Sequence, residues 1–369
     1  MYRIPLIKPY ITGEIKARVC AVLDSGYLTE GPVTRELEAH FRAHTGAPHA
    51  IAVCNCTVGL EMALRAMGVG PGDEVVVPDY TYPATASAAA IVGAKIVLVD
   101  VSPDTMLMDG DALEAAITPR TKAVIPVSIF GNPLDYDRLN DIRSRRGVKI
   151  LEDAACSIGA VYRGRKVGDW ADISVFSLHP RKFITTGEGG MVTTRDEGWA
   201  EWMESYKHFG MGPSATREGT VFARIGTNYK LSNIQAAVGV VQMRDVEMLL
   251  ARRRELAGRY TALLTGMDGV RLPAVVAGGI HAHQSYCVFV EERDRIMAAM
   301  RQAGIEVQIG TYALHLHPAY QEGVACRWAG SLANSERVFR ECLALPLFHD
   351  LSETDQDTVV EELRRAIRG

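Results

Sequence analysis

The lysine at position 182 is the strongest candidate in this chain for covalent chemistry. It lies in a turn-rich, glycine-rich segment between two β-rich runs, Ile173–Phe176 and Met191–Thr194. An ordinary lysine with a pKa near ~10.4 is only about 0.04 % unprotonated at neutral pH, so a nucleophilic role requires burial or a permanent Schiff base. Glycine suits a backbone that passes close to a ligand. The alternative is a solvated lysine on a surface loop, and this segment alone does not decide between them.

The turn that ends at Thr57 is a candidate phosphate site. It follows the β-rich run Ala50–Val53 and precedes apolar residues at helical spacing. The free N–H groups and the positive dipole at a helix start favour an anion, so the amides of Cys56 and Thr57 and the Thr57 hydroxyl are candidate contacts. Ser177, five residues before Lys182, could donate a further hydrogen bond. Thr57 could equally be a helix N-cap without a ligand.

Two adjacent carboxylates and a tyrosine could hold a planar ring. Glu152 and Asp153 end the run that starts at Val148, and Tyr82 lies in a proline-flanked turn. A buried carboxylate that faces a cationic ring nitrogen keeps the ring protonated, as a pyridine cofactor requires. The end of the strand decides which carboxylate does so; otherwise Asp153 caps a helix, Glu152 forms an ion pair and Tyr82 only packs. A lysine, a carboxylate, an aromatic ring and hydroxyls at strand ends together predict a pyridoxal phosphate (PLP) site.

The elements that would position these residues alternate between strand and helix. From about residue 50 to 195, short β-rich runs are separated by amphipathic or alanine-rich segments, which predicts a mostly parallel sheet with helices on both faces. Ligand sites in such α/β sheets gather at the carboxyl ends of the strands. Ser232 and Gln235 fit a capping box that starts a long helix reaching Leu249. We expect a large domain over 1–245 and a smaller α/β domain over 246–369.

Composition excludes several other classes of protein. The 369 residues carry a net charge of −4, and the basic run Arg252–Arg254 lies among acidic residues, so we expect no nucleic-acid partner. Seven widely spread cysteines indicate reduced thiols, and the spacing of Cys54 and Cys56 predicts no metal site. No apolar run approaches the ~18 residues of a membrane span, and the first residues lack the apolar core of a signal peptide, so we expect a cytoplasmic protein.

Six motifs, in order along the chain, resemble those of one protein family. They are Asp24–Pro32, Asn55–Thr57, Pro78–Ala86, Glu152–Cys156, Ser177–Lys182 with Thr185–Gly190, and Gly226–Ser232. From Ile4 to about Ile367, the sequence resembles the sugar aminotransferases of the DegT/DnrJ/EryC1/StrS family. The resemblance implies the fold-type I PLP-dependent transferase fold, with a mostly parallel, seven-stranded type of sheet and a smaller C-terminal α/β domain.

The resemblance also implies a role for each candidate. Lys182 forms the Schiff base with PLP, Asp153 rather than Glu152 meets the pyridine nitrogen, and Tyr82 stacks on the ring. The phosphate contacts are then Ser177, Thr57 and the Cys56 amide, with Asn228 reaching in from the other subunit of a homodimer. The family often has glycine at position 56 and glutamine or histidine at position 156, so Cys156 lies beside the cofactor without an assigned role.

The implied reaction is a transamination. An amino group passes from L-glutamate to the keto carbon of a nucleotide-linked sugar, and Lys182 distinguishes the chain from a dehydrating branch of the family that has histidine there. Thr185–Gly190 resembles the loop of members that aminate C4 of 4-keto-6-deoxy sugars, for polysaccharide or glycoside biosynthesis. His315 and Glu188 are candidate substrate contacts, with a surface histidine as the alternative for His315. The rival functions are a C3-ketosugar or keto-cyclitol aminotransferase and a non-catalytic PLP-binding regulator.

Overall fold

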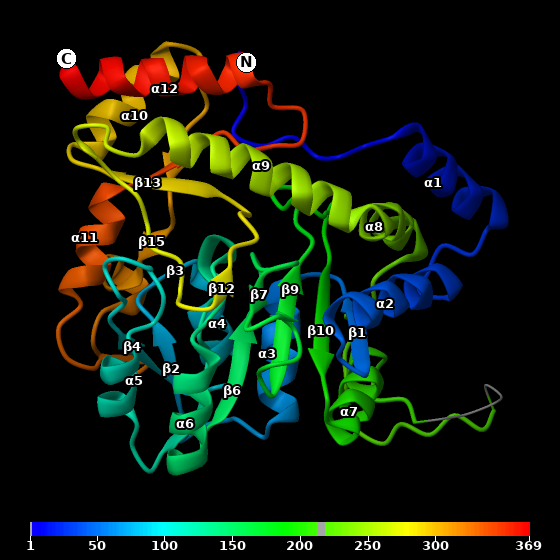
Figure 1. The fold of residues 1–369 in the computed structure, drawn as a ribbon. Coiled ribbons are helices and arrows are strands. Elements are labelled where there is room, and N and C mark those ends of the chain that lie inside the picture. Colours follow the sequence, from blue (N-terminus) through cyan, green and yellow to red (C-terminus); the bar gives the residue numbers. More distant parts are fainter. Residues whose placement is uncertain (1, 213–217) are drawn as a thin grey trace.

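Short runs rich in β-branched residues form an eight-stranded sheet at the centre of the molecule (Figure 1). The computed structural model describes residues 2–212 and 218–369. In spatial order the strands are β1 (His49–Val53), β10 (Gly190–Thr194), β9 (Ile173–Ser177), β6 (Lys149–Asp153), β5 (Thr121–Val124), β2 (Glu74–Pro78), β4 (Lys95–Val99) and β16 (Cys326–Trp328). Every pair is parallel except those that β10 makes with β1 and β9.

Helices cover both faces of this sheet. Successive strand residues point to opposite faces, so Val76 belongs to one buried cluster while Val75 and Val77 belong to the other. The first cluster includes residues of α2 (Pro32–Thr45), α5 (Gly110–Ala116), α6 (Tyr136–Arg146) and α8 (Asn233–Arg244); the second includes residues of α3 (Cys56–Ala66), α4 (Pro83–Ile91) and α7 (Glu197–Lys207). The predicted α/β class is confirmed. The sheet has one strand more than expected, because the three-residue β16 joins the edge strand β4 from far along the chain.

A second, antiparallel sheet lies in the C-terminal part. Its strands are β11 (Val270–Arg271), β13 (Tyr286–Val290), β17 (Cys342–Leu345) and β14 (Gln308–Ile309). A third buried cluster packs α9 (Val246–Leu264), α10 (Arg293–Gln302) and α12 (Glu353–Arg368) against it. This part also returns to the large sheet through β16. Its strand β15 (Tyr312–Ala313) pairs with β3 (Tyr80–Thr81), which follows β2, in a separate two-stranded sheet. The division into domains at residue 245 therefore stays a prediction.

The predicted long helix after Ser232 is two helices. The capping box of Ser232 and Gln235 is present and starts α8. The helix ends at Asp245, whose φ of −89° and ψ of 4° leave the helical region, and α9 starts at the next residue. Aspartate is a weak helix former, and the Asp245 carboxylate accepts a hydrogen bond from the Tyr10 hydroxyl at 3.3 Å. The prediction of one helix was wrong because this distant contact is invisible in the local pattern.

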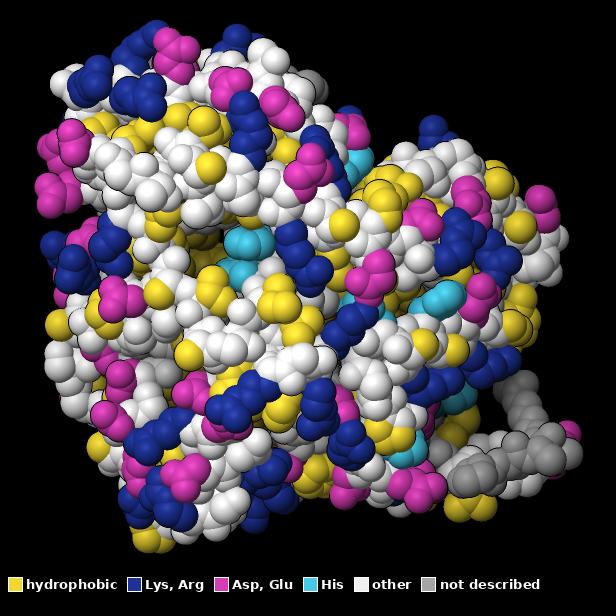
Figure 2. All heavy atoms as spheres, in the orientation of Figure 1, with side chains coloured by type: hydrophobic (Ala, Val, Ile, Leu, Met, Phe, Trp, Pro, Cys, Tyr) yellow, Lys and Arg dark blue, Asp and Glu magenta, His cyan; other side chains and the backbone are white. Residues whose placement is uncertain are grey.

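The remaining elements and the surface complete the description. They are α1 (Gly13–Ser25), α11 (Ala333–Glu341), β7 (Val161–Tyr162), β8 (Arg165–Lys166), β12 (Gly279–Ile280) and three short 3₁₀ turns. Acidic and basic side chains are intermixed on the face that Figure 2 shows. In the part of the chain that the structure describes, no helix is both long and apolar enough to cross a membrane.

Candidate active site

Lys182 lies in the loop between β9 and β10, with its side chain directed to a cysteine. Its backbone N–H donates to the carbonyl of His179 at 2.8 Å, and its Nζ lies 3.0 Å from Sγ of Cys156. Burial lowers the pKa of Lys182, but Cys156, Cys56 and Asp153 together raise it above its ordinary value. Burial alone therefore does not deprotonate this lysine. A covalent bond to the nitrogen is the other route to a nucleophilic amine.

Asp153 is the last residue of β6 and lies on the same side of the sheet as Lys182. The carboxylate is 5 % exposed and accepts hydrogen bonds from the Thr85 hydroxyl at 2.7 Å and from the amide of Ala155 at 3.2 Å. Burial raises its pKa, partly offset by these donors and by Lys182. In residues 2–212 and 218–369, no lysine, arginine or histidine forms an ion pair with it. A buried carboxylate in this condition is stabilised by any cation that enters the site.

Glu152 points to the opposite face of the sheet. Its carboxylate is fully buried and accepts hydrogen bonds from the hydroxyls of Ser128, Tyr136 and Ser174, at 2.7 Å from Tyr136 and 2.9 Å from Ser174. Successive residues of a strand alternate between faces, so only one of the two carboxylates can face Lys182. That one is Asp153. Glu152 instead accepts hydrogen bonds from three hydroxyls. The alternative prediction from the sequence, that Glu152 forms an ion pair, was wrong.

The turn before α3 presents two free amides. Asn55, not Thr57, is the N-cap, and its side chain accepts a hydrogen bond from the amide of Val58 at 3.0 Å. Cys56 and Thr57 are the first two helical residues, so neither amide has an acceptor within the helix. No other acceptor contacts these two amides among the described residues. The N-cap interpretation of Thr57 is wrong, and the geometry of an anion site is present.

Ser177 and this turn lie on two sides of Gly190. Gly190 pairs with Ser177 of β9 and with Val53 of β1, at the ends of all three strands. A Cβ at Gly190 would lie 2.8 Å from the backbone of Asn55 and Cys56, closer than real Cβ atoms come. The missing side chain therefore lets the turn approach the end of β9, where the hydroxyl of Ser177 is buried.

Three further candidates are exposed side chains. Tyr82 precedes α4, is 64 % exposed and has its ring 6.2 Å from that of Tyr312. Glu188 is exposed, with its carboxylate 3.9 Å from the ring of His179. Asn228 is exposed and accepts a hydrogen bond from Lys230 at 2.6 Å. In the described part of the chain, no contact joins Glu188 or Asn228 to Lys182.

His315 is buried and paired, so its alternative as a surface histidine is wrong. It is 8 % exposed, and its Nδ1 lies 2.6 Å from the carboxylate of Asp79, which also accepts its backbone N–H at 2.8 Å. The hydrogen bond with Asp79 raises the pKa of His315. The ring meets the edge of Trp328 at 5.4 Å between centroids. The structure thus holds a histidine whose cationic form is favoured, close to β3.

Comparison with known proteins identifies the family of the chain. The sequence profile of the DegT/DnrJ/EryC1/StrS aminotransferase family matches residues 9–364. The chain belongs to this family. Among curated relatives of this aminotransferase, the spore coat polysaccharide biosynthesis protein SpsC of Bacillus subtilis (strain 168) is 34 % identical over 380 residues, which cover 99 % of this chain and 97 % of SpsC.

Solved structures of relatives share the fold of this DegT/DnrJ/EryC1/StrS aminotransferase over its whole length. DesV of S. venezuelae, solved in complex with a ketimine intermediate, has a TM-score of 0.91 and 32 % identity, and covers 100 % of both chains. Spr1654 of Streptococcus pneumoniae, solved in its PLP-form, has a TM-score of 0.93 and 30 % identity, and covers 100 % of this chain and 99 % of its own. The predicted fold of the PLP-dependent transferases is confirmed.

Sequence reasoning missed several residues that support the site of this aminotransferase. Thr85, the donor to Asp153, lies in the quoted motif three residues after Tyr82, so helical spacing from Tyr82 could have indicated it. Gln284 and Gln242 hold the lysine loop from 101 and 57 residues away in sequence, and no local signal points to them. Lys207, in α7, is the fourth residue that the sequence did not indicate.

A buried lysine, Lys207, forms an ion cluster with three carboxylates next to β1, just before the turn that leads into α3. The lysine is 1 % exposed, and its Nζ lies 3.0 Å from Glu204, 3.2 Å from Glu30 and 3.6 Å from Glu38. Lys207 donates to the carbonyl of Ala52 at 3.2 Å, and Glu38 accepts from the amide of the same residue at 2.9 Å. The cluster therefore binds both backbone polar groups of one residue of β1, Ala52.

We expect stability to fall as the pH rises through the titration of Glu38. Burial raises the pKa of Glu38 from 4.5 to about 7. Between these values the folded protein binds more protons than the unfolded chain, so the free energy of unfolding decreases with pH, by at most about 3 kcal/mol from this group. Urea unfolding at about pH 5 and about pH 8 measures the loss. In Glu38→Gln, which keeps the acceptor for Ala52, the loss should be smaller; an equal loss in both proteins contradicts the assignment.

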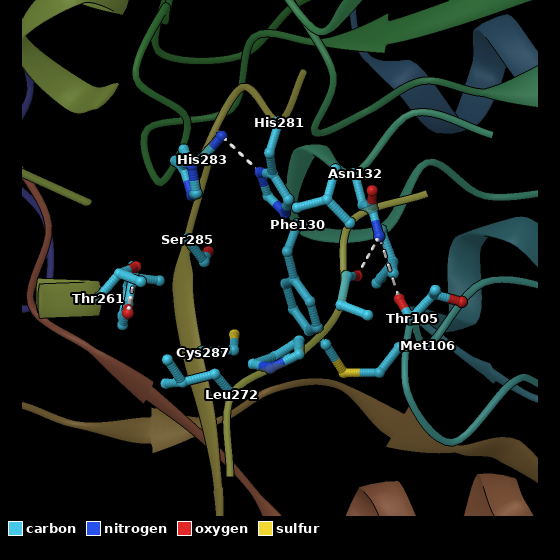
Figure 3. Close-up of a pocket in the computed structure, with 15 residues that line it drawn as sticks. Thr105, Met106, Phe130, Asn132, Thr261, Leu272, His281, His283, Ser285 and Cys287 are labelled. Carbon is cyan, nitrogen blue, oxygen red and sulfur yellow. Dashed lines mark hydrogen bonds between the residues drawn. The ribbon is translucent and has the colours of Figure 1, made fainter. Parts of the chain in front are cut away.

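A separate cavity of about 170 Å³ lies between the two sheets (Figure 3). It is lined by side chains that include Phe130, Asn132, His281, His283 and Ser285, and by none of the predicted site residues. The rings of His281 and His283 stack at 4.2 Å between centroids, and burial lowers the pKa of both. The cavity is thus distinct from the site around Lys182.

Proposed function

We propose that this chain is a PLP-dependent aminotransferase acting on keto sugars, with Lys182 as the residue that binds the cofactor covalently. The observation that carries the proposal is the proximity of Lys182 and Asp153, each of which shifts the pKa of the other. A Schiff-base lysine needs a carbonyl carbon to bond to, and the buried carboxylate, which forms no ion pair with a lysine, arginine or histidine of the described residues, needs a cation. A cationic ring that carries an aldehyde satisfies both needs at once.

The other residues around this pair fit the same cofactor. The free amides of Cys56 and Thr57 and the hydroxyl of Ser177 suit a phosphate. The exposed ring of Tyr82, at the start of α4, suits the face of a planar ring. The residues present therefore match a group with an aldehyde, a basic ring nitrogen and a phosphate.

When bound, PLP supplies an electron sink for the negative charge that forms when the α-proton of an amino acid leaves. The chain supplies the rest. Lys182, once its nitrogen is free, takes and returns that proton, and Cys156 lies close enough to hold the amine by a hydrogen bond. Asp153 keeps the ring nitrogen protonated, and Thr85 fixes the direction of that carboxylate.

L-Glutamate is the proposed donor, and the C4 ketone of a nucleotide-linked 4-keto-6-deoxy sugar is the proposed acceptor. The loop from Thr185 to Gly190 and the sequence resemblance support this choice, and the description of SpsC as a polysaccharide biosynthesis protein agrees with a sugar substrate. His315, held by Asp79, is the proposed contact for acceptor oxygens, and Glu188 is a second one. A C3 ketone and a keto-cyclitol are the alternative acceptors.

A homodimer completes the proposal. The segment after α7 extends away from the sheet in Figure 1, and its side chains include the exposed apolar residues Phe209, Val221, Phe222 and Ile225, the last 96 % exposed. Exposed apolar groups on an extended segment favour burial against another chain. A second copy is the proposed occupant, because it would carry Asn228 toward the phosphate of the neighbouring site.

Turnover with a panel of keto-sugar nucleotides tests the acceptor. We expect the holoenzyme with L-glutamate to aminate 4-keto-6-deoxy substrates at least about 10-fold faster than 3-keto substrates, since placing the wrong carbon over Lys182 loses the reacting geometry. Mass spectrometry of the products and 2-oxoglutarate release measure both rates. Turnover of 3-keto substrates alone would overturn the C4 assignment.

The non-catalytic alternative needs its own measurement. A regulator that only binds PLP would show no conversion when L-glutamate is added without an acceptor. An aminotransferase releases one equivalent of 2-oxoglutarate per site under the same conditions. Failure of this half-reaction in fully loaded protein would remove the proposed function itself.

A further inference from the structure

Lys182 is fixed by two peptide groups that flank it, and one side chain binds both. The Oε1 of Gln284 accepts the amide of Phe183 at 3.1 Å, and the Nε2 of Gln284 donates to the carbonyl of Arg181 at 2.8 Å. Gln284 is 5 % exposed. Its amide thus uses one donor and one acceptor on the residues immediately before and after the lysine, in an irregular loop with no sheet or helix to hold it.

The position of Gln284 is itself held from behind. Arg253, in α9, is 2 % exposed and donates to the carbonyls of His283 and Gln284, each at 2.7 Å. Its guanidinium also lies 5.1 Å from the centre of the Phe183 ring. Burial lowers the pKa of Arg253 to about 9, so it stays charged at neutral pH and makes charge-assisted hydrogen bonds.

The backbone around Gln284 directs its side chain to the lysine loop. His283 and Ser285 line the separate cavity (Figure 3), whereas Gln284 does not and instead contacts the lysine loop. His283 has a φ of 54°, in the left-handed region that residues other than glycine rarely adopt. Such strain persists only where the surroundings determine the conformation.

Resting on the proposed function, we propose that Gln284 is a positioning residue that sets where the amine of Lys182 can reach. A lysine side chain has four rotatable bonds, so the backbone at its root decides which positions Nζ samples. A misplacement of 1 Å can cost about 10²-fold in rate. Gln284 therefore acts on catalysis through Lys182 without touching substrate or cofactor, and Arg253 supports it.

Two substitutions separate this role from simple stability. Gln284→Leu removes both hydrogen bonds, and Gln284→Glu keeps an acceptor for Phe183 but turns a second oxygen to the carbonyl of Arg181. Protonation of that glutamate restores a donor. We expect kcat of Gln284→Leu to fall about 10²-fold with KM for L-glutamate within about threefold of wild type. The ratio of kcat for Gln284→Glu to wild-type kcat should rise as the pH falls.

Hydrogen exchange supplies a readout that needs no turnover. In the apoenzyme, the amide of Phe183 should exchange at least about 10-fold faster in Gln284→Leu than in wild type, because its acceptor is gone. Gln356→Leu is the matched control. Gln356 is a fully buried glutamine in α12, and its side-chain amide donates to the carbonyl of Leu256 in α9 at 2.9 Å. This substitution should lower the melting temperature and leave both Phe183 exchange and kcat unchanged.

The outcomes are distinct from those that test the proposed function. If wild-type protein releases no 2-oxoglutarate from L-glutamate, the function fails, whatever Gln284 does to exchange. If wild type is active and Gln284→Leu keeps kcat within threefold, the positioning role is overturned. The same holds if the kcat ratio of Gln284→Glu does not change with pH.

Discussion

Lys182→Ala should abolish transamination. We expect kcat for the glutamate half-reaction to fall by about 10⁴-fold, the upper end of what a positioned acid–base group contributes. The alanine variant has neither the nitrogen that bonds to the cofactor nor the base that moves the α-proton. Stopped-flow absorbance of the reconstituted protein with L-glutamate measures the rate. The protein mass after borohydride reduction should show the cofactor attached in wild type and not in the variant.

Lys149→Ala is the matched control for this substitution. Lys149 is also a partly buried lysine, at the first residue of β6, and it donates to the carbonyl of Met67 at 2.7 Å. Asp153 is the last residue of the same strand, so Lys149 lies at the opposite end of β6 from the candidate site. It should keep wild-type activity. Full activity in Lys182→Ala would remove the basis of the proposed mechanism.

A small amine should restore part of the activity lost in Lys182→Ala. The truncated side chain leaves space at the amine position, and an added alkylamine can take up the proton there. A rate that grows with amine concentration would show that the chemistry of the nitrogen, and not a disturbed fold, was removed. Unfolding in urea should differ little between the variant and wild type, because the lysine side chain makes one hydrogen bond within the described residues, to Cys156.

The sequence predicts the strand ends well because local patterns carry them. The strand before Lys182 and the strand that carries Asp153 are short apolar runs between turns, and both lie within two residues of their predicted bounds. Strand-end residues of parallel strands meet at one edge of the sheet, so Lys182 and Asp153 could be brought together from the pattern. The family resemblance then selected Asp153 over Glu152, and strand alternation in the structure places Asp153 on the side of Lys182.

Contacts across long sequence separations could not be predicted in the same way. Nothing near Gln284 indicates that its amide reaches the lysine loop, because the approach depends on how the antiparallel sheet docks on the parallel one. Another long-range contact joins Glu38 and Lys207, through the packing of α2 and α7 on either side of β1. The local sequence does not indicate this contact either. The three residues of β16 are too few for a periodic signal, and only the free edge of β4 explains their place.

Asp153 and Thr85 show how a missed residue refines a predicted one. The sequence assigns the charge to Asp153, whereas the structure shows what holds that charge in direction: a buried hydroxyl from α4, itself 2.9 Å from the hydroxyl of Thr81. Because Thr85 holds Oδ2 and the amide of Ala155 holds Oδ1, the carboxylate is fixed in one orientation. The energetic contributions of charge and of orientation can therefore be separated by two substitutions.

Asp153→Asn should reduce the rate of the glutamate half-reaction by about 10²- to 10⁴-fold, which corresponds to the roughly 3–5 kcal/mol lost when a buried charged pair is broken. The amide is close in shape and keeps an oxygen for Thr85, but it carries no charge to hold a ring nitrogen protonated. Thr85→Val keeps the charge and loses one donor, so a loss of about 10- to 10²-fold is expected from the roughly 1.5–3 kcal/mol of a hydrogen bond to a charged group. Single-turnover absorbance of both reconstituted variants gives the two rates.

An analogue of the cofactor tests the role of the charge directly. In Asp153→Asn no carboxylate holds the proton on the ring nitrogen of the cofactor. The rate of this variant should therefore recover when PLP is replaced by its N-methylated analogue, whose ring nitrogen is permanently cationic. An Asp153→Asn protein within threefold of wild type would mean that another group supplies the charge, and the assignment of Asp153 would be lost while that of Lys182 stood.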